Sequence, residues 1–111
     1  MENEIAIRKL TNRILKANRR LLASHADPRN SDRASWGSLA VASFANVTGQ
    51  SADVETDPET VLGDLLAGLM HWSDVQKARD NLEEPIDFES ALERARHHYQ
   101  EECDYEREEF A

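Results

Sequence analysis

The sequence lacks several features by which a protein's class is usually recognised. Cys103 is the only cysteine, so the chain can form no internal disulfide and no cysteine-rich zinc site. The longest apolar stretch, from Val61 to Met70, is interrupted by Asp64 and falls well short of the roughly 20 residues that span a membrane. The first residues carry acids, whereas a secretory signal begins with bases and an apolar run. These absences predict a cytoplasmic protein that does not contact a membrane and owes its stability to packing.

Signals for β-structure are missing as well. No segment alternates apolar and polar residues with a period of two, and no Asn-Gly or Asp-Gly turn joins two apolar runs. The chain has no internal repeat or long linker, and 111 residues are the usual length of one domain. We therefore expect an all-α protein that forms a single compact bundle of about four helices over residues 1–111.

Four segments, residues 4–24, 32–48, 58–76 and 88–109, have the apolar spacing of helices. The apolar residues of the first follow each other at intervals of three and four and share one side: Ile7, Leu10, Ile14, Ala17 and Leu21. This seam also leaves open a homodimer through the first helix. Ser31 or Asp32 is expected to cap the second helix, and Gly49 to end it. Its expected apolar face consists of Trp36, Leu39, Ala40, Phe44 and Val47.

The third and fourth helices have clear start signals. Asp57-Pro58-Glu59 combines a capping carboxylate, a proline at the first helical position and an acid near the positive end of the helix dipole. Apolar residues cover much of the third helix, which we expect at the centre of the core. Asp87 is expected to cap the fourth. The polar segment 50–56 is typical of a loop, whereas 76–84 could be an exposed helix or a loop.

Charge is unevenly distributed along the chain. The net charge is −9, but residues 1–33 hold eight bases and four acids, whereas residues 34–111 hold five bases and 18 acids. A basic face is expected on the first helix, formed by Arg8, Lys9, Arg13, Lys16 and Arg20. The acidic remainder repels nucleic-acid phosphates and favours a protein partner with a basic surface, although an acidic balance can also serve solubility alone. We do not expect direct nucleic-acid binding.

Several polar residues of the third and fourth helices share a helix side. Asp64 and His71 are seven residues apart, and His97 lies four residues before Glu101. They could face a cleft or a metal ion with His98, or form an ordinary solvated surface. The residues that we expect to contact a partner are Asp64, His71, Trp72, Asp74, His97 and Glu101.

Motifs of the familiar enzyme classes are absent. The chain has no phosphate-binding glycine loop, no Gly-x-Ser-x-Gly elbow, no His-Glu-x-x-His and no EF-hand loop. We assign no catalytic residue, cofactor or metal ligand.

Two segments carry a resemblance to other proteins. Asp64 to Asp74 reads DLLAGLMHWSD, and Ile86 to Glu101 reads IDFESALERARHHYQE. Together they resemble a group of short bacterial and phage-type proteins, which implies a mobile-element or accessory role but no catalytic residues.

A weaker similarity, through Leu62-Gly-Asp64-Leu-Leu and Ile86-Asp87, is to the MazG-like all-α nucleotide pyrophosphohydrolases. That family binds magnesium through Glu-x-x-Glu and Glu-x-x-Asp motifs, and Val61 stands three residues before Asp64 in this chain.

We therefore expect a small acidic helical binding protein that acts on a macromolecular partner as an inhibitor or nucleic-acid mimic. One alternative is a metal-dependent nucleotide hydrolase that uses Asp64 with His71, Asp74 or His98. The other is a nucleic-acid binder that uses the basic first helix.

Overall fold

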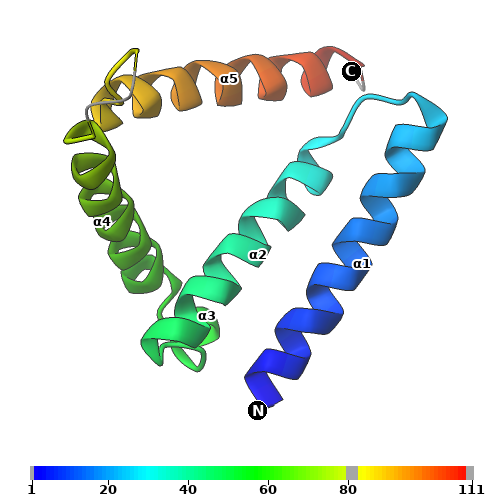
Figure 1. Cartoon of the computed structure of the whole chain (residues 1–111). Helices are drawn as coiled ribbons and strands as arrows, with labels where there is room; N and C mark the ends of the chain where they lie inside the picture. Colours follow the sequence, from blue (N-terminus) through cyan, green and yellow to red (C-terminus); the bar gives the residue numbers. More distant parts are fainter. Residues whose placement is uncertain (1, 80–82, 110–111) are drawn as a thin grey trace. The chain divides into compact units, whose positions relative to one another are not determined.

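The computed structural model of the chain describes residues 2–79 and 83–109 (Figure 1). These residues form five helices: α1 (Glu2–Ser24), α2 (Asn30–Thr48), α3 (Asp53–Thr56), α4 (Pro58–Lys77) and α5 (Phe88–Glu109). No strand occurs within the described ranges, so the all-α prediction is confirmed. The four long helices begin and end within two residues of the ranges that the sequence predicts.

The chain divides into two units, Met1–Leu62 and Gly63–Ala111, and α4 begins in the first and continues into the second. We refer to them as unit 1 and unit 2. The single compact bundle over the whole chain stays a prediction, as does a single domain. No described helix is both long and apolar enough to cross a membrane.

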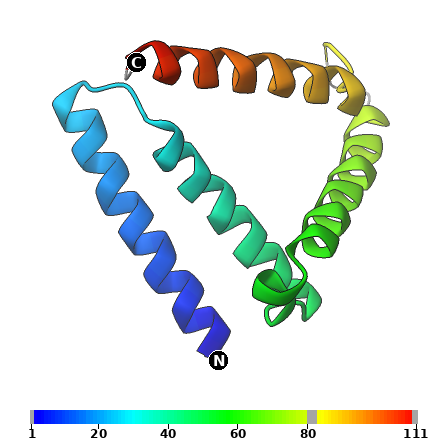
Figure 2. The ribbon, with the colours of Figure 1, turned by 180° about the vertical axis from the view of Figure 1, so that it is seen from behind.

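Unit 1 is built on an antiparallel hairpin of α1 and α2, which lie side by side in both ribbon views (Figures 1 and 2). Ile7, Leu10, Ile14 and Leu21 of the predicted seam are half-buried, and α2 is the helix that packs along α1. The chain leaves α1 through His25, whose φ of 56° is unusual for a residue with a side chain. The seam of α1 is therefore used within the chain.

The buried side of α2 differs from the predicted apolar face. Ala45 is fully buried and Val41 is half-buried, whereas the side chain of Val47 is 84% exposed. Apolar residues occur on every side of α2, so the pattern does not specify which side is covered. Alanine allows another segment to approach closely, which a count of large apolar residues does not show.

The short helix α3 lies in the segment that the sequence predicts as a loop. The N–H of Asp53 donates to the carbonyl of Gln50 at 2.9 Å, and the N–H of Asp57 donates to the carbonyl of Asp53 at 2.8 Å. Val54 is half-buried and lines a groove with Ile7 and Ala42. One apolar residue thus fixes a single helical turn that is too short to produce a periodic pattern.

Most of the predicted helix ends are confirmed. α2 ends at Gly49, whose φ is 75°, and α4 begins at Pro58, with Asp57 Oδ1 accepting the N–H of Thr60 at 3.4 Å. α2 begins two residues earlier than the sequence suggests. Its Asp32 Oδ2 accepts the N–H of Arg29 at 2.8 Å, as the third residue of a capping box does.

Unit 2 contains α5 and most of α4. α4 ends at Lys77, within the segment that could be helix or loop, and residues 80–82 of that segment lie outside the described residues. Asp87 caps α5 as predicted, because its Oδ2 accepts the N–H of Ser90 at 3.1 Å and the Ser90 hydroxyl at 2.9 Å. Among the described residues, no Cα atom of α4 lies within 8 Å of a Cα atom of α5. The two helices of unit 2 therefore do not cover each other.

Candidate partner-binding site

The polar candidates of α4 share one side of that helix. Asp64 and His71 lie almost in line along it, since seven residues are nearly two turns, and Asp74 lies within a quarter turn of them. All three side chains are exposed. A partner can reach this side without any rearrangement of α4.

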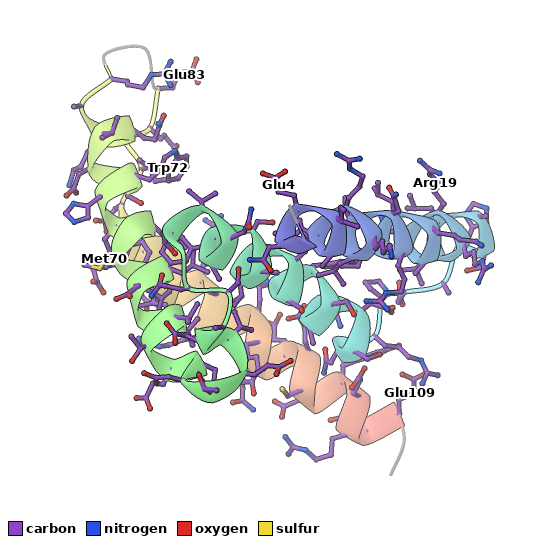
Figure 3. All side chains as sticks on the ribbon, turned by 90° about the horizontal axis from the view of Figure 1, so that it is seen from below. Glu4, Arg19, Met70, Trp72, Glu83 and Glu109 are labelled. Carbon is purple, nitrogen blue, oxygen red and sulfur yellow. The ribbon has the colours of Figure 1, made fainter. Side chains whose placement is uncertain are left out.

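Trp72 belongs to a different side of α4. It lies at one edge of an apolar surface, and Met70 lies at the other edge, so that the two side chains point in different directions from the helix (Figure 3). Trp72 is exposed, as expected of a residue available to a partner. It lies about 80° around the helix from Asp64 and about 100° from His71, so it borders their side of α4.

The histidines of α5 do not converge on one point. His97 Nε2 lies 2.9 Å from Glu101 Oε1, and both side chains are mostly exposed. The ring of His98 is 6.4 Å from the ring of His97, centroid to centroid, with the planes tilted by 55°. The predicted pair of His97 and Glu101 is thus a surface ion pair of one helix, which forms when the imidazole is protonated.

A band of carboxylates runs along α5 beside this pair. Glu93, Glu101, Asp104 and Glu108 lie within a quarter turn of one another around the helix, and we call them the acidic face. Asp104 accepts hydrogen bonds from Arg107 at 2.8 Å and from Gln100 at 3.1 Å. The other three side chains are exposed. Neither unit-2 helix supplies enough bases to neutralise this face.

Cys103 lies on the opposite, apolar side of α5. It is half-buried, and it hydrogen-bonds with Tyr99 one turn earlier, which together with the charge of the thiolate raises the pKa of the Tyr99 hydroxyl. The position agrees with a small apolar residue of the helix stripe and gives no sign of a nucleophile activated by a base.

Most of the basic face of α1 turns away from the seam that packs on α2, and Arg13 lies at its edge, where it lines a hollow between the two helices. Arg8, Lys9, Arg13, Lys16 and Arg20 are all exposed, and within the described part of unit 1 none of them pairs with an acid. Arg19 also projects outward from α1 (Figure 3). These bases are solvated in unit 1 and available to an anion.

Two hollows of unit 1 were not expected from the sequence. One, of about 300 Å³, lies between α1 and α2 and is lined by Leu10, Arg13, Ile14, Asp32 and Trp36, among others. The second, of about 540 Å³, is open to solvent and lies beside Leu15, Leu22 and Pro28. Leu15 and Leu22, seven residues apart, are the signal in the sequence, since they widen the apolar side of α1 beyond its seam.

The described residues do not assemble a metal centre. No group of three or more His, Cys, Asp or Glu side chains in residues 2–79 and 83–109 is placed to hold a metal ion. Asp64, His71 and Asp74 lie on α4 and His98 lies on α5, and these helices do not contact each other.

Comparison of the chain with models of protein families, with curated proteins and with solved structures finds no match.

Proposed function

We propose that this chain is a non-enzymatic binding protein that holds a macromolecular partner with a basic surface through the acidic face of α5. The observation that carries the proposal is the exposure of Glu93, Glu101 and Glu108 along one side of a helix with eight acids and three bases. A surface with this charge attracts basic partners and raises their rate of association.

The dimensions of the acidic face suit a protein that normally binds nucleic acid. Glu93 and Glu108 are 15 residues apart, which corresponds to about 22 Å of helix. Phosphates of one DNA strand follow each other at about 3.4 Å, so the face extends over the length of about six nucleotides. We therefore propose inhibition of a nucleic-acid-handling protein, whose phosphate-binding surface the acidic face would occupy. The resemblance to short phage-type proteins supports this role.

The polar side of α4 is the second proposed contact. Asp64, His71 and Asp74 are exposed and lie in unit 2, which carries the acidic face as well. Their carboxylates add negative charge to unit 2, and the imidazole adds a donor for a polar group of the partner.

A matched pair of variants tests the proposal. Glu93→Gln, Glu101→Gln, Asp104→Asn and Glu108→Gln together neutralise the acidic face. Glu4→Gln, Asp27→Asn, Asp53→Asn and Glu55→Gln together make the same change of net charge on exposed residues of unit 1. The tagged chain and both variants are immobilised, and proteins are captured from nuclease-treated host lysate over a series of salt concentrations.

We expect one stoichiometric partner on the wild type and on the unit-1 variant, lost from the acidic-face variant and lost from the wild type at high salt. Equal capture by all three chains, or binding that salt does not change, would contradict the proposal. Absence of any partner at low salt would contradict it as well.

The basic face of α1 supports a second candidate, binding of nucleic acid. Its observation is that the five bases are all exposed along α1, and that Arg8, Lys9, Lys16 and Arg20 lie away from the hollow between α1 and α2 that Arg13 helps to line. A gel-shift experiment at low salt with single- and double-stranded oligonucleotides decides this candidate. A shift that disappears in the Arg13→Gln, Lys16→Gln, Arg20→Gln variant supports it, and the lack of any shift removes it.

A further inference from the structure

One side of α4 carries a continuous apolar surface, which we call the leucine stripe. It consists of Leu62, Leu65, Leu66, Leu69, Met70 and Trp72. Leu65 is half-buried, and the other five side chains are between 38% (Leu66) and 53% (Trp72) exposed. Ser73, one turn after Leu69 on the same side of α4, is only 5% exposed, so the apolar surface available to a partner ends at Trp72.

Within the described part of unit 2, α5 does not pack on the leucine stripe. α5 has no Cα atom within 8 Å of α4 among the described residues, and its own apolar side is a narrow row that includes Leu92 and Tyr99. Exposed single apolar residues are ordinary, but five on one side of one helix form a patch that marks an interaction surface.

The size of the stripe suits a dimer of this chain. Its exposed side chains offer roughly 450 Å² of apolar surface. A stable interface buries about 800 Å² on each partner, of which about 56–65% is apolar, and this corresponds to roughly 450–520 Å². The stripe alone therefore supplies the apolar part of a two-fold interface.

The charges at the ends of α4 specify how two copies would pack. Glu59 lies in the first turn, Lys77 lies in the last, and both lie beside the stripe on the edge that carries Met70. In an antiparallel pair, Glu59 of each copy faces the partner's Lys77. In a parallel pair, both Glu59 side chains lie at one end and both Lys77 side chains at the other, so neither charge meets an opposite one.

We propose that the chain forms a two-fold symmetric dimer in which the leucine stripes of two α4 helices pack antiparallel. The surface differs from α1, whose seam is half-buried in the hairpin with α2. Asp64 and His71, which lie on the opposite side of α4, stay accessible in the dimer. Because two acidic α5 helices then belong to one assembly, a partner with two basic sites gains avidity.

Molar mass measured by sedimentation equilibrium over a range of concentrations tests whether the dimer exists. We expect the mass of the wild type to rise from 12.6 kDa to twice that value as concentration increases. Leu66→Glu should remain monomeric at every concentration, because it places a charge in the middle of the interface.

Val75→Glu is the control, because Val75 lies on the far side of α4 and is 64% exposed. Its dimerisation should equal that of the wild type, while circular dichroism shows that both variants keep their helices. A wild type that is monomeric at all concentrations, as it would be if another part of the chain covered the stripe, would overturn the proposal. Leu66→Glu that still forms dimers would overturn it too.

Single cysteines introduced in a Cys103→Ser background test the antiparallel orientation. In an antiparallel pair with Glu59 opposite the partner's Lys77, position 69 lies near its own counterpart. Position 62 then faces position 74, about 18 Å along the helix from its counterpart. A disulfide requires Cα atoms about 6 Å apart.

We therefore expect Leu69→Cys to form a covalent dimer on mild oxidation, and Leu62→Cys to form none. Cross-linking of both variants would show a parallel pair and overturn the antiparallel arrangement. The dimer proposal does not depend on the outcome of the acidic-face experiment. The dimer is tested by molar mass with variants of α4, whereas the acidic face is tested by partner capture with variants of α5.

Discussion

In unit 1 the apolar seam of α1 packs on α2, whereas in unit 2 the leucine stripe of α4 has no cover from α5. Charge follows the same division. Residues 1–62 contain eight acids and eight bases, and residues 63–111 contain 14 acids and five bases, so unit 2 carries the whole net charge of −9. The hairpin of unit 1 is balanced in charge and covers the seam of α1 itself. A charged unit with an uncovered apolar side has the composition of a binding surface, in which an apolar centre is surrounded by polar groups.

The largest expected change in stability comes from a substitution of Ala45, which is fully buried in unit 1. Ala45→Asp places an unpaired carboxylate in the interior, and we expect it to lower the free energy of unfolding by about 3 kcal/mol or more. Urea unfolding followed by circular dichroism measures the loss. Ala40→Asp, at an exposed position of the same helix, should leave the midpoint nearly unchanged. Equal losses in the two variants would contradict a self-sufficient unit 1.

Two glycines of α2 should respond to alanine with opposite signs. At Gly49 the φ of 75° disfavours any side chain, so Gly49→Ala should destabilise the chain by about 1 kcal/mol. Gly37 lies within the helix with no atom within 4 Å of an added Cβ, so Gly37→Ala should stabilise it by about 0.5–1 kcal/mol. Thermal unfolding of the two variants measures both changes in stability. If both substitutions changed the stability in the same direction, the positive φ of Gly49 at the end of α2 would be contradicted.

The smallest effect concerns the cap of α5. The Ser90 hydroxyl and N–H donate to the carboxylate of Asp87 and, with the nearby charge of Lys77, hold the pKa of Asp87 below the ordinary value of an aspartate. The stabilisation is therefore complete above the pKa of the unfolded chain, and it is lost as the pH falls through the lower folded value.

Asp87→Ala should accordingly reduce helix content at neutral pH, by an amount that disappears in strong acid, whereas Asp87→Asn should retain the cap at every pH. Circular dichroism of the three proteins over a pH titration checks this. A difference between wild type and Asp87→Ala that persists unchanged in strong acid would show that the carboxylate does not form the cap.

The sequence predicts those parts of the fold that depend on neighbouring residues. Asp57-Pro58, Asp87 and Gly49 mark helix ends correctly because each acts through its own backbone turn. The start of α2 and the turn α3 were missed because Arg29 has no capping side chain of the usual kind and a single turn has no period.

Packing is the part that periodicity cannot supply. The pattern shows that α4 has a wide apolar side but not which surface covers it, and we expected this helix in the core. The same limit applies to the candidate site. Asp64 and His71 do share a helix side as predicted, yet nothing in their spacing could show that Trp72 belongs to the leucine stripe or that the histidines of α5 stay apart.

The contrast between the units is tested most directly by hydrogen exchange of the full chain, followed by mass spectrometry at several protein concentrations. The protection of amides in α1 and α2 should be independent of concentration, because the hairpin covers itself. The protection of amides in α4 should rise as the concentration increases and a second copy covers the leucine stripe. Strong protection of α4 that is the same at the lowest and highest concentrations would contradict the account, because the stripe would then be covered within a single chain.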